Sequence, residues 1–166
     1  MVGLGVVTLG VPAALGCSSD PMPADTTVGP ENAFIAVVQW ELEETEPIVD
    51  EDGDVEAPVI YLAAGSGETV DVGVQANVVA TIDESAVIRF ADQAVDAVDV
   101  GVDGEPVKDD GVLLVVDAFE SGQPEVDARI SRYRSIDDDT NWILRLTATD
   151  EGVDVSDAVE ADDSTS

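Results

Sequence analysis

The side chains that could carry chemistry in this sequence are its carboxylates and one cysteine, Cys17. The 166-residue chain holds 37 Asp and Glu residues and no histidine. The lack of histidine removes Ser-His-Asp and Cys-His catalysis, together with His-based zinc, copper and haem sites. A single cysteine has no internal disulfide partner and supplies too few thiolates for an iron–sulfur cluster. Carboxylate chemistry remains, as a pair of acids acting on a sugar or as an oxygen cage for Ca²⁺.

Two acidic clusters have the composition of an oxygen-rich Ca²⁺ site. Their members are Asp50, Asp52, Asp54 and Glu56 in DEDGDVE, and Asp137, Asp138, Asp139 and Asn141 in DDDTN. The first cluster begins like an EF-hand loop but lacks the glycine and the final glutamate which that loop requires. The sequence therefore predicts at most a generic Ca²⁺ site between strands, and the alternative is two solvated acidic loops.

Pairs of carboxylates are weak evidence for catalysis here, because with so many acids two will be neighbours by chance. Glycoside hydrolysis needs two facing acids in a cleft, and such clefts usually offer aromatic platforms. Aromatic residues make up only 4% of this chain. The Gly65-Ser66-Gly67 segment lacks the third glycine and the following helix of a dinucleotide-binding loop, so it predicts a tight turn. We expect a protein that is not an enzyme and has no cofactor other than Ca²⁺.

The net charge of −31 is the strongest compositional feature, and Lys108 is the only lysine. Exposed like charges repel over roughly 10 Å at 0.1 M salt but only about 3 Å at 1 M. An acidic, lysine-poor surface is therefore typical of a protein from a high-salt environment, although a GC-rich genome would also make lysine scarce. Phosphates would be repelled, which excludes nucleic acid as a partner.

Four of the six basic residues fall in one stretch, as Arg129, Arg132, Arg134 and Arg145. They could form a basic patch for an anionic ligand. We expect instead that they pair with the abundant carboxylates, because the planar guanidinium binds a carboxylate through two parallel hydrogen bonds.

The N-terminal residues 1–16 are apolar, small and uncharged, which is typical of a signal peptide and too short for a membrane-spanning helix. They end in Ala14-Leu15-Gly16-Cys17, which resembles the lipobox of exported lipoproteins. This resemblance implies that Cys17 is lipidated and becomes the new N-terminus. No Lys or Arg precedes the apolar run, so one explanation is a start codon a few residues upstream. The alternative is a buried N-terminal strand with an incidental cysteine.

The rest of the chain predicts one domain with flanking segments. Residues 17–32, rich in Pro, Ser and Asp, suit a flexible tether, residues 33–150 form the domain, and residues 151–166 form an acidic, disordered tail. Apolar or alternating runs predict strands at 33–42, 59–64, 69–82, 86–90, 95–102, 112–119, 126–136 and 142–149. A short helix near 85–98 competes with the strand at 86–90, which we favour, and Asp103-Gly104 predicts a hairpin turn.

This pattern indicates a mainly β protein, and we expect a single immunoglobulin-like β-sandwich of about seven strands. Residues 88–107 resemble a repeat domain of unknown function from bacterial and archaeal surface lipoproteins, through Val98-Asp99-Val100-Gly101-Val102-Asp103-Gly104. The histidine and the S-P-D-A-P segment of that family are absent, and no function is carried over.

Together these observations predict a non-enzymatic binding or structural module adapted to high salt. We expect it to be exported and held at the extracytoplasmic face of a membrane by the lipid on Cys17. Its partner there would be a protein or a polysaccharide. The alternative is a calcium-dependent carbohydrate-binding module or a carboxylate-based glycoside hydrolase.

Overall fold

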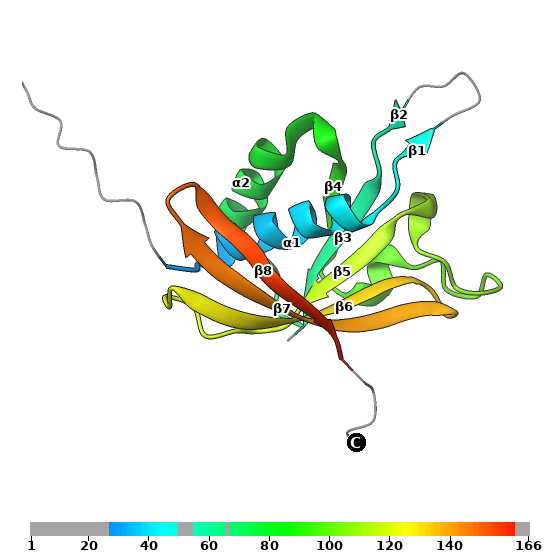
Figure 1. The fold of residues 1–166 in the computed structure, drawn as a ribbon. Helices are drawn as coiled ribbons and strands as arrows, with labels where there is room; N and C mark the ends of the chain where they lie inside the picture. The colour runs from blue at the N-terminus through cyan, green and yellow to red at the C-terminus, as the bar shows by residue number, and fades with distance from the viewer. Residues whose placement is uncertain (1–26, 50–54, 66, 162–166) are drawn as a thin grey trace, which may run out of the picture.

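The main strands of this protein form one mixed sheet, and two helices cover one of its faces (Figure 1). The computed structural model describes residues 27–49, 55–65 and 67–161. The elements follow in the order α1 (Pro30–Glu44), β1 (Ile48–Val49), β2 (Val55–Glu56), β3 (Val59–Ala64), α2 (Val72–Ile82), β4 (Val87–Phe90), β5 (Val112–Val116), β6 (Glu125–Ser135), β7 (Asp138–Thr149) and β8 (Gly152–Glu160). Within these residues, 3-10 turns lie at Asp83–Ser85, Ala94–Ala97 and Lys108–Asp110.

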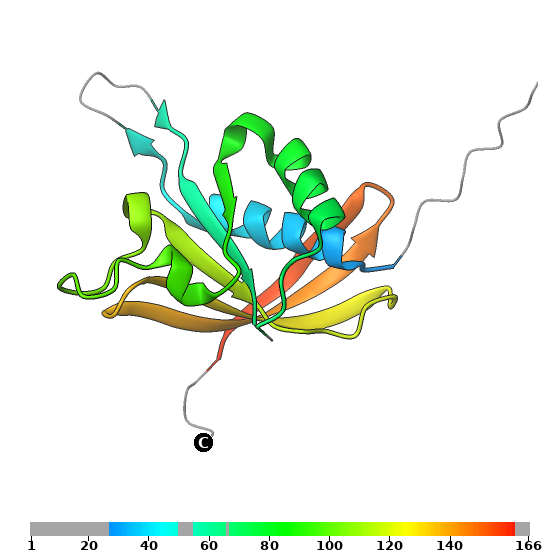
Figure 2. The same cartoon turned by 180° about the vertical axis from the view of Figure 1, so that it is seen from behind.

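The strands of the large sheet are arranged in the order β4-β3-β5-β6-β7-β8, and β1 pairs with β2 separately. Strand β3 runs parallel to both of its neighbours, with Ile60 opposite Ile88 of β4 and Val112 of β5. Strands β5 to β8 form an antiparallel meander. Parallel neighbours need a crossover connection, and α2 supplies the one between β3 and β4 (Figure 2).

The two faces of the sheet are covered differently. The face under α1 and α2 carries the main core, with large, fully buried side chains at Ile60, Leu62, Leu114, Ile130, Leu144 and Leu146. On the opposite face a smaller cluster forms where the segment between β4 and β5 packs on β3 and β5 through Ala97 and Val107. We call this opposite face the lower face of the sheet.

The prediction of a mainly β protein is confirmed, and strands β3 to β7 fall within or close to predicted ones. The immunoglobulin-like sandwich is not confirmed. In the described part of the chain, six strands lie in one sheet, and helices take the place of a second sheet. The physical reason is that two of the predicted strands are the helices that cover the main core.

The first of these is the segment 33–42, which lies within α1. Pro30 is placed at the first helical positions, where its missing N–H is not needed. The helix buries Ala33, Val37 and Trp40, which are spaced as one helical face requires. An apolar run of this length fits a buried strand and a buried helix equally well, so the prediction of a strand was wrong.

The second is the segment 69–82, most of which lies in α2. The side chain of Asp71 caps this helix by accepting a hydrogen bond from the N–H of Gly73 at 2.8 Å. Val74, Val78 and Ile82 then pack on the core at a spacing of four residues. The alternation of Val70, Val72 and Val74, which favoured a strand, runs across this cap, so that Val72 and Val74 lie in the first turn of the helix.

The segment 95–102 is not a strand either. It consists of the end of the 3-10 turn Ala94–Ala97 and a loop closed by a bridge between Val98 and Val107. A turn is present at Asp103-Gly104, where the N–H of Glu105 donates to the carbonyl oxygen of Val102 and Gly104 adopts the left-handed conformation at φ 78°, but it does not connect two strands. The favoured strand at 86–90 is confirmed as β4.

The C-terminal segment corrects the predicted domain boundaries. Residues 152–160 form β8, which pairs with β7 from Gly152 opposite Thr149 to Glu160 opposite Trp142. Val153 and Val155 pack on the main core, and this alternation outweighs the acidic composition that predicted disorder. Helix α1 also begins at Pro30, inside the predicted tether, whereas residues 1–26 lie outside the described residues.

The core under α1 makes a direct prediction about stability. Val37 on α1 is fully buried, whereas Val72 on α2 is 76% exposed. We expect Val37→Ala to lower the free energy of unfolding by about 2 kcal/mol, from two buried methyl groups at roughly 0.8 kcal/mol each plus a cavity. Val72→Ala, the matched control in a helix, should change it by less than about 0.5 kcal/mol. Urea unfolding measures both, and equal effects would contradict the described packing of α1.

Candidate functional site: a groove beside a buried ion cluster

The candidate site is built around Glu41, a carboxylate on the face of α1 that packs on the sheet. Only 1% of its side chain is exposed. Arg132 Nε on β6 donates to Glu41 Oε2 at 2.8 Å, and Arg134 Nη2 donates to Glu41 Oε1 at 3.1 Å. The hydroxyl of Thr45 donates to Oε1 at 2.8 Å, and Arg134 Nη2 also donates to that hydroxyl at 3.1 Å. Both carboxylate oxygens are therefore satisfied.

This cluster follows from the period of each element. Arg132 and Arg134 are two residues apart on β6, so both side chains lie on the sheet face that α1 covers. Thr45 lies four residues after Glu41, which places it one turn further along the same face. Removing a carboxylate from water costs several kcal/mol unless it is paired and hydrogen-bonded, and two arginines meet both needs. The arrangement is well suited to fixing α1 on β6.

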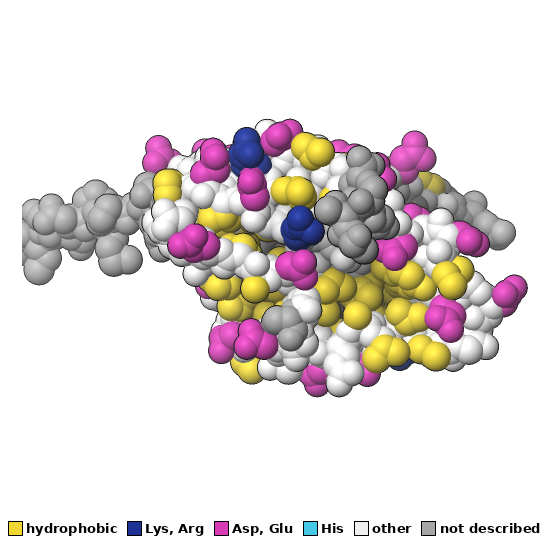
Figure 3. Space-filling model, turned by 90° about the horizontal axis from the view of Figure 1, so that it is seen from below, with side chains coloured by type: hydrophobic (Ala, Val, Ile, Leu, Met, Phe, Trp, Pro, Cys, Tyr) yellow, Lys and Arg dark blue, Asp and Glu magenta, His cyan; other side chains and the backbone are white. Residues whose placement is uncertain are grey.

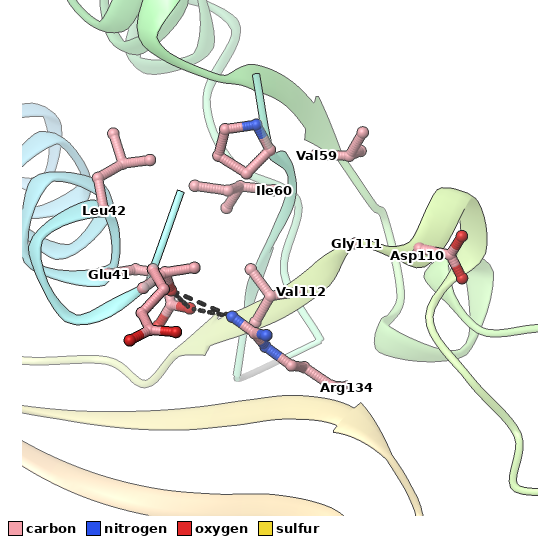
Figure 4. Close-up of a pocket in the computed structure, with 11 residues that line it drawn as sticks. Glu41, Leu42, Val59, Ile60, Asp110, Gly111, Val112 and Arg134 are labelled. Atoms are coloured by element: carbon pink, nitrogen blue, oxygen red, sulfur yellow. Dashed lines mark hydrogen bonds and ion pairs between the residues drawn. The ribbon is translucent and has the colours of Figure 1, made fainter. Parts of the chain in front are cut away.

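A groove opens beside this cluster, between the C-terminal end of α1 and the strands (Figure 4). Its inner part has a volume of about 70 Å³ and is lined by Glu41, Arg134 and Ile60, among others. Its outer part measures about 560 Å³. The two parts share Leu42, Thr45, Glu46 and Pro58.

The walls of the outer groove combine apolar and acidic side chains. Leu42, Pro47 and Val55 provide apolar surface, and Glu46, Glu56 and Glu84 provide the carboxylates. The inner end is closed near Gly111, where a Cβ atom would lie 2.7 Å from the carbonyl oxygen of Val59. A groove of this kind can bind a ligand. No step of acid–base catalysis follows from it, because Glu41 is held by three hydrogen-bond donors and the acids of the outer wall are exposed or solvated.

A second polar cluster lies on the lower face, where Arg89 of β4 pairs with Asp109 beside Tyr61 of β3. The Tyr61 hydroxyl donates to Asp109 Oδ2 at 2.8 Å, and the guanidinium carbon of Arg89 lies 5.6 Å from the centroid of the Tyr61 ring. The hydrogen bond from Tyr61 holds the pKa of Asp109 below its ordinary value, and burial raises the pKa of Tyr61. Asp109 is therefore ionised and Tyr61 protonated at neutral pH. Because the pKa of Asp109 is lowered on folding, its contribution to stability is lost only as the pH falls into the acid range.

The predicted internal pairing of the arginines is confirmed for Arg132, Arg134 and Arg145. It is not confirmed for Arg129, which is exposed. Arg89, which the prediction did not include, pairs with Asp109. Arg132 also contacts Asp138 at 3.4 Å, and Arg145 contacts Asp127 at 3.0 Å on the lower face.

The predicted site residues are not brought together in the described part of the chain. Cys17, Asp50, Asp52 and Asp54 lie outside the described residues. Asp137 is exposed in the turn after β6, Asp138 pairs with Arg132, and Asp139 follows on β7, where successive side chains point to opposite faces. Among the residues that the structure describes, no three His, Cys, Asp or Glu side chains are placed to hold a metal ion.

Trp40 and Trp142 pack against each other between α1 and the sheet. Their ring centroids lie 5.4 Å apart in an edge-to-face arrangement, and Trp40 is only 7% exposed. Trp40 borders a hollow of about 180 Å³ together with Glu43 and Asp154. Because its ring is buried against Trp142, it offers little surface on which a sugar could stack.

Sequence reasoning did not identify Glu41, although a signal was present. Glu41 follows directly after the apolar run and lies four residues after Val37, on the same helical face. An acid on the buried face of a helix needs a cationic partner, and two neighbouring arginines two residues apart on a strand could have supplied it. The prediction of a strand at 33–42 concealed this spacing.

Comparison with known proteins adds no relationship to this geometry. The chain matches no protein-family model, and it has no significant match among curated proteins or solved structures. Within the described residues, neither helix has the length and apolar character needed to cross a bilayer.

The ion cluster can be tested by removing its charge. We expect Glu41→Gln to lower the free energy of unfolding by about 3–5 kcal/mol, because Arg132 and Arg134 lose the charge that compensates their burial. Glu43→Gln, the matched control on the exposed side of the same helix, should change it by less than about 0.5 kcal/mol. Denaturant unfolding of both variants is the measurement. A small effect of Glu41→Gln would contradict the role assigned to the cluster.

Proposed function

We propose that this protein is a non-enzymatic binding or structural module at the extracytoplasmic face of a membrane, held there by a lipid on Cys17. The observation that best supports a non-enzymatic role is the use of Glu41. It is the one buried charged side chain among the described residues, and both of its oxygens serve to join α1 to β6. The remaining acids of this part of the chain are exposed or half-buried.

The distribution of charge supports adaptation to high salt. Acidic side chains are spread over the surface seen from below, with few basic groups among them (Figure 3). Inside, Val and Ala make up more than half of the buried hydrophobic positions in the described residues. A folded protein with this surface charge becomes more stable as salt screens the repulsion between its acidic side chains.

The membrane location rests on the N-terminal sequence, because Cys17 lies outside the described residues. Helix α1 begins 13 residues after Cys17, so the folded domain would follow the lipid after a short connection. In this position the domain could bind a protein or a polysaccharide at the cell surface, and its net charge of −31 disfavours nucleic acid.

A calcium-dependent carbohydrate binder or a carboxylate-based glycosidase is the second candidate. The hollow lined by Trp40, Glu43 and Asp154 favours it, because it combines an aromatic residue with two acids. We give it less weight, because the Trp40 ring is packed against Trp142.

The anchor makes a prediction about the native protein. Intact-mass analysis of the protein from its own cells should show an acylated Cys17 as the first residue, and the protein should remain with the membrane fraction. Cys17→Ser should release the chain in soluble form, whereas Ser18→Ala, the neighbouring control, should not. Recovery of the wild-type chain as an unprocessed, water-soluble protein would overturn the anchor.

Salt adaptation makes a prediction about unfolding. We expect the melting temperature to rise steadily from 0.1 M to 2 M KCl, because repulsion between surface acids is screened. A gain of about 2 kcal/mol corresponds to a rise of roughly 4–8 °C for a chain of this size. Removing an exposed acid of β8 by Asp154→Asn should raise the midpoint in low salt and reduce the salt dependence. A midpoint independent of KCl would contradict the proposal.

The same assay separates the two candidate functions. At constant ionic strength, millimolar CaCl₂ should raise the melting temperature no more than KCl does if the acidic side chains are only solvated. A saturating rise in the melting temperature with CaCl₂ would favour the calcium-dependent alternative.

A further inference from the structure

Apolar side chains are exposed on the loop between β4 and β5 and on the turn between β6 and β7. Val95, Val100, Val102 and Ile136 are 53%, 63%, 53% and 64% exposed. The first three belong to this loop, and Ile136 lies in the turn between β6 and β7. We call these four residues the apolar tip. Figure 3 shows hydrophobic side chains gathered across the lower face.

The apolar tip is held firmly by hydrogen bonds, although it lies outside the sheet. The N–H of Val107 donates to the carbonyl oxygen of Arg134 at 2.9 Å, and the N–H of Ile136 donates to that of Gly104 at 3.0 Å. The hydroxyl of Tyr133 adds a bond to the carbonyl oxygen of Glu105 at 2.9 Å. These bonds join the loop to the end of β6. A surface that is ordered in advance loses little conformational entropy on binding.

The surroundings of the apolar tip are acidic. Each apolar residue is adjacent in sequence to an exposed carboxylate, as Asp96 follows Val95, Asp99 precedes Val100, Asp103 follows Val102 and Asp137 follows Ile136. The only lysine, Lys108, donates a hydrogen bond from its ammonium group to the carbonyl oxygen of Asp96 at 2.6 Å. The tip is thus an apolar surface with a negatively charged border.

Charge decides which partner fits this surface. A second copy of the chain would place two negative borders together, and anionic lipid headgroups would meet the same repulsion. The loop between β4 and β5 also lies at the opposite end of the domain from the start of α1 (Figures 1 and 2). A domain attached through its N-terminus would therefore present the tip away from the attachment point.

We propose that the apolar tip docks into a partner protein through an apolar recess bordered by Lys or Arg side chains. This inference rests on the proposed role as a binding module, but it does not depend on the lipid anchor. The valines would provide the buried centre of the interface, and the aspartates would pair with the basic border and orient the partner.

A peptide titration in solution tests this inference. The probe is a synthetic amphipathic peptide of Leu and Lys, and a Ser and Lys peptide and a Leu and Glu peptide are the controls. Backbone amide shifts of the full chain would be followed in 0.5 M KCl, which suppresses general attraction to the acidic surface. We expect the Leu and Lys peptide to shift residues 95–104 and 135–137, and the controls to bind at least about tenfold more weakly.

Matched variants identify the surface. Val100→Ser combined with Val102→Ser should weaken binding of the Leu and Lys peptide about tenfold or more, because apolar contact area is lost. Val72→Ser combined with Val79→Ser changes two exposed valines on α2, at a distance from the tip, and should leave binding unchanged. Unfolding curves establish that both variants are folded.

Three outcomes would overturn the inference: equal binding of the Ser and Lys peptide, equal loss in both double variants, or shifts located in the groove beside Glu41. Self-association in sedimentation experiments that is abolished by the tip variant would also overturn it, in favour of a second copy. None of these outcomes bears on whether intact-mass analysis finds an acylated Cys17. The docking proposal and the lipid-anchor proposal can therefore fail independently of each other.

Discussion

The ion cluster around Glu41 is the interaction on which the rest of the structure depends. It is the point where a chain with a large excess of acids buries one of them, and it uses two of the few arginines to do so. Because Arg132 and Arg134 lie on β6, the cluster sets both the position of α1 along the sheet and its rotation about its own axis. The groove at the end of α1 takes its shape from the same contacts.

The remaining charges follow a simple division between the two faces of the sheet. Where helices cover the sheet, apolar side chains pack together, and Glu41 is the one acid of the described residues that is buried there. On the lower face, Arg89 and Arg145 hold neighbouring carboxylates at the surface, where each pair contributes little to stability. Apolar packing therefore supplies the stability of the domain, and the surface charge governs its response to salt.

The sequence allowed β3, β5, β6 and β7 to be predicted, because short apolar or alternating runs with clear breaks have few other interpretations. It did not allow α1 and α2 to be predicted, because runs rich in Val and Ala suit a buried helix as well as a strand and only the cap at Asp71 and Pro30 distinguishes them. Strand β8 was not predicted, because its acidic outer side chains indicated a disordered tail. The candidate site requires α1 to be a helix, because only helical spacing places Glu41 on the same face as Val37, so a predicted strand gives no reason to pair Glu41 with Arg132.

The parallel pairing of β3 bears on the order in which the domain assembles. Strands β5 to β8 meet through connections of a few residues, so their contacts close short loops. Strand β3 instead pairs with β5 through residues that are about fifty positions apart in the sequence, such as Ile60 and Val112. It also lies between β4 and β5 in the sheet. Such a long closure costs more chain entropy before any contact is gained, and long-range parallel pairing is intrinsically slow. The meander can therefore form early and act as a template, and insertion of β3 completes the core.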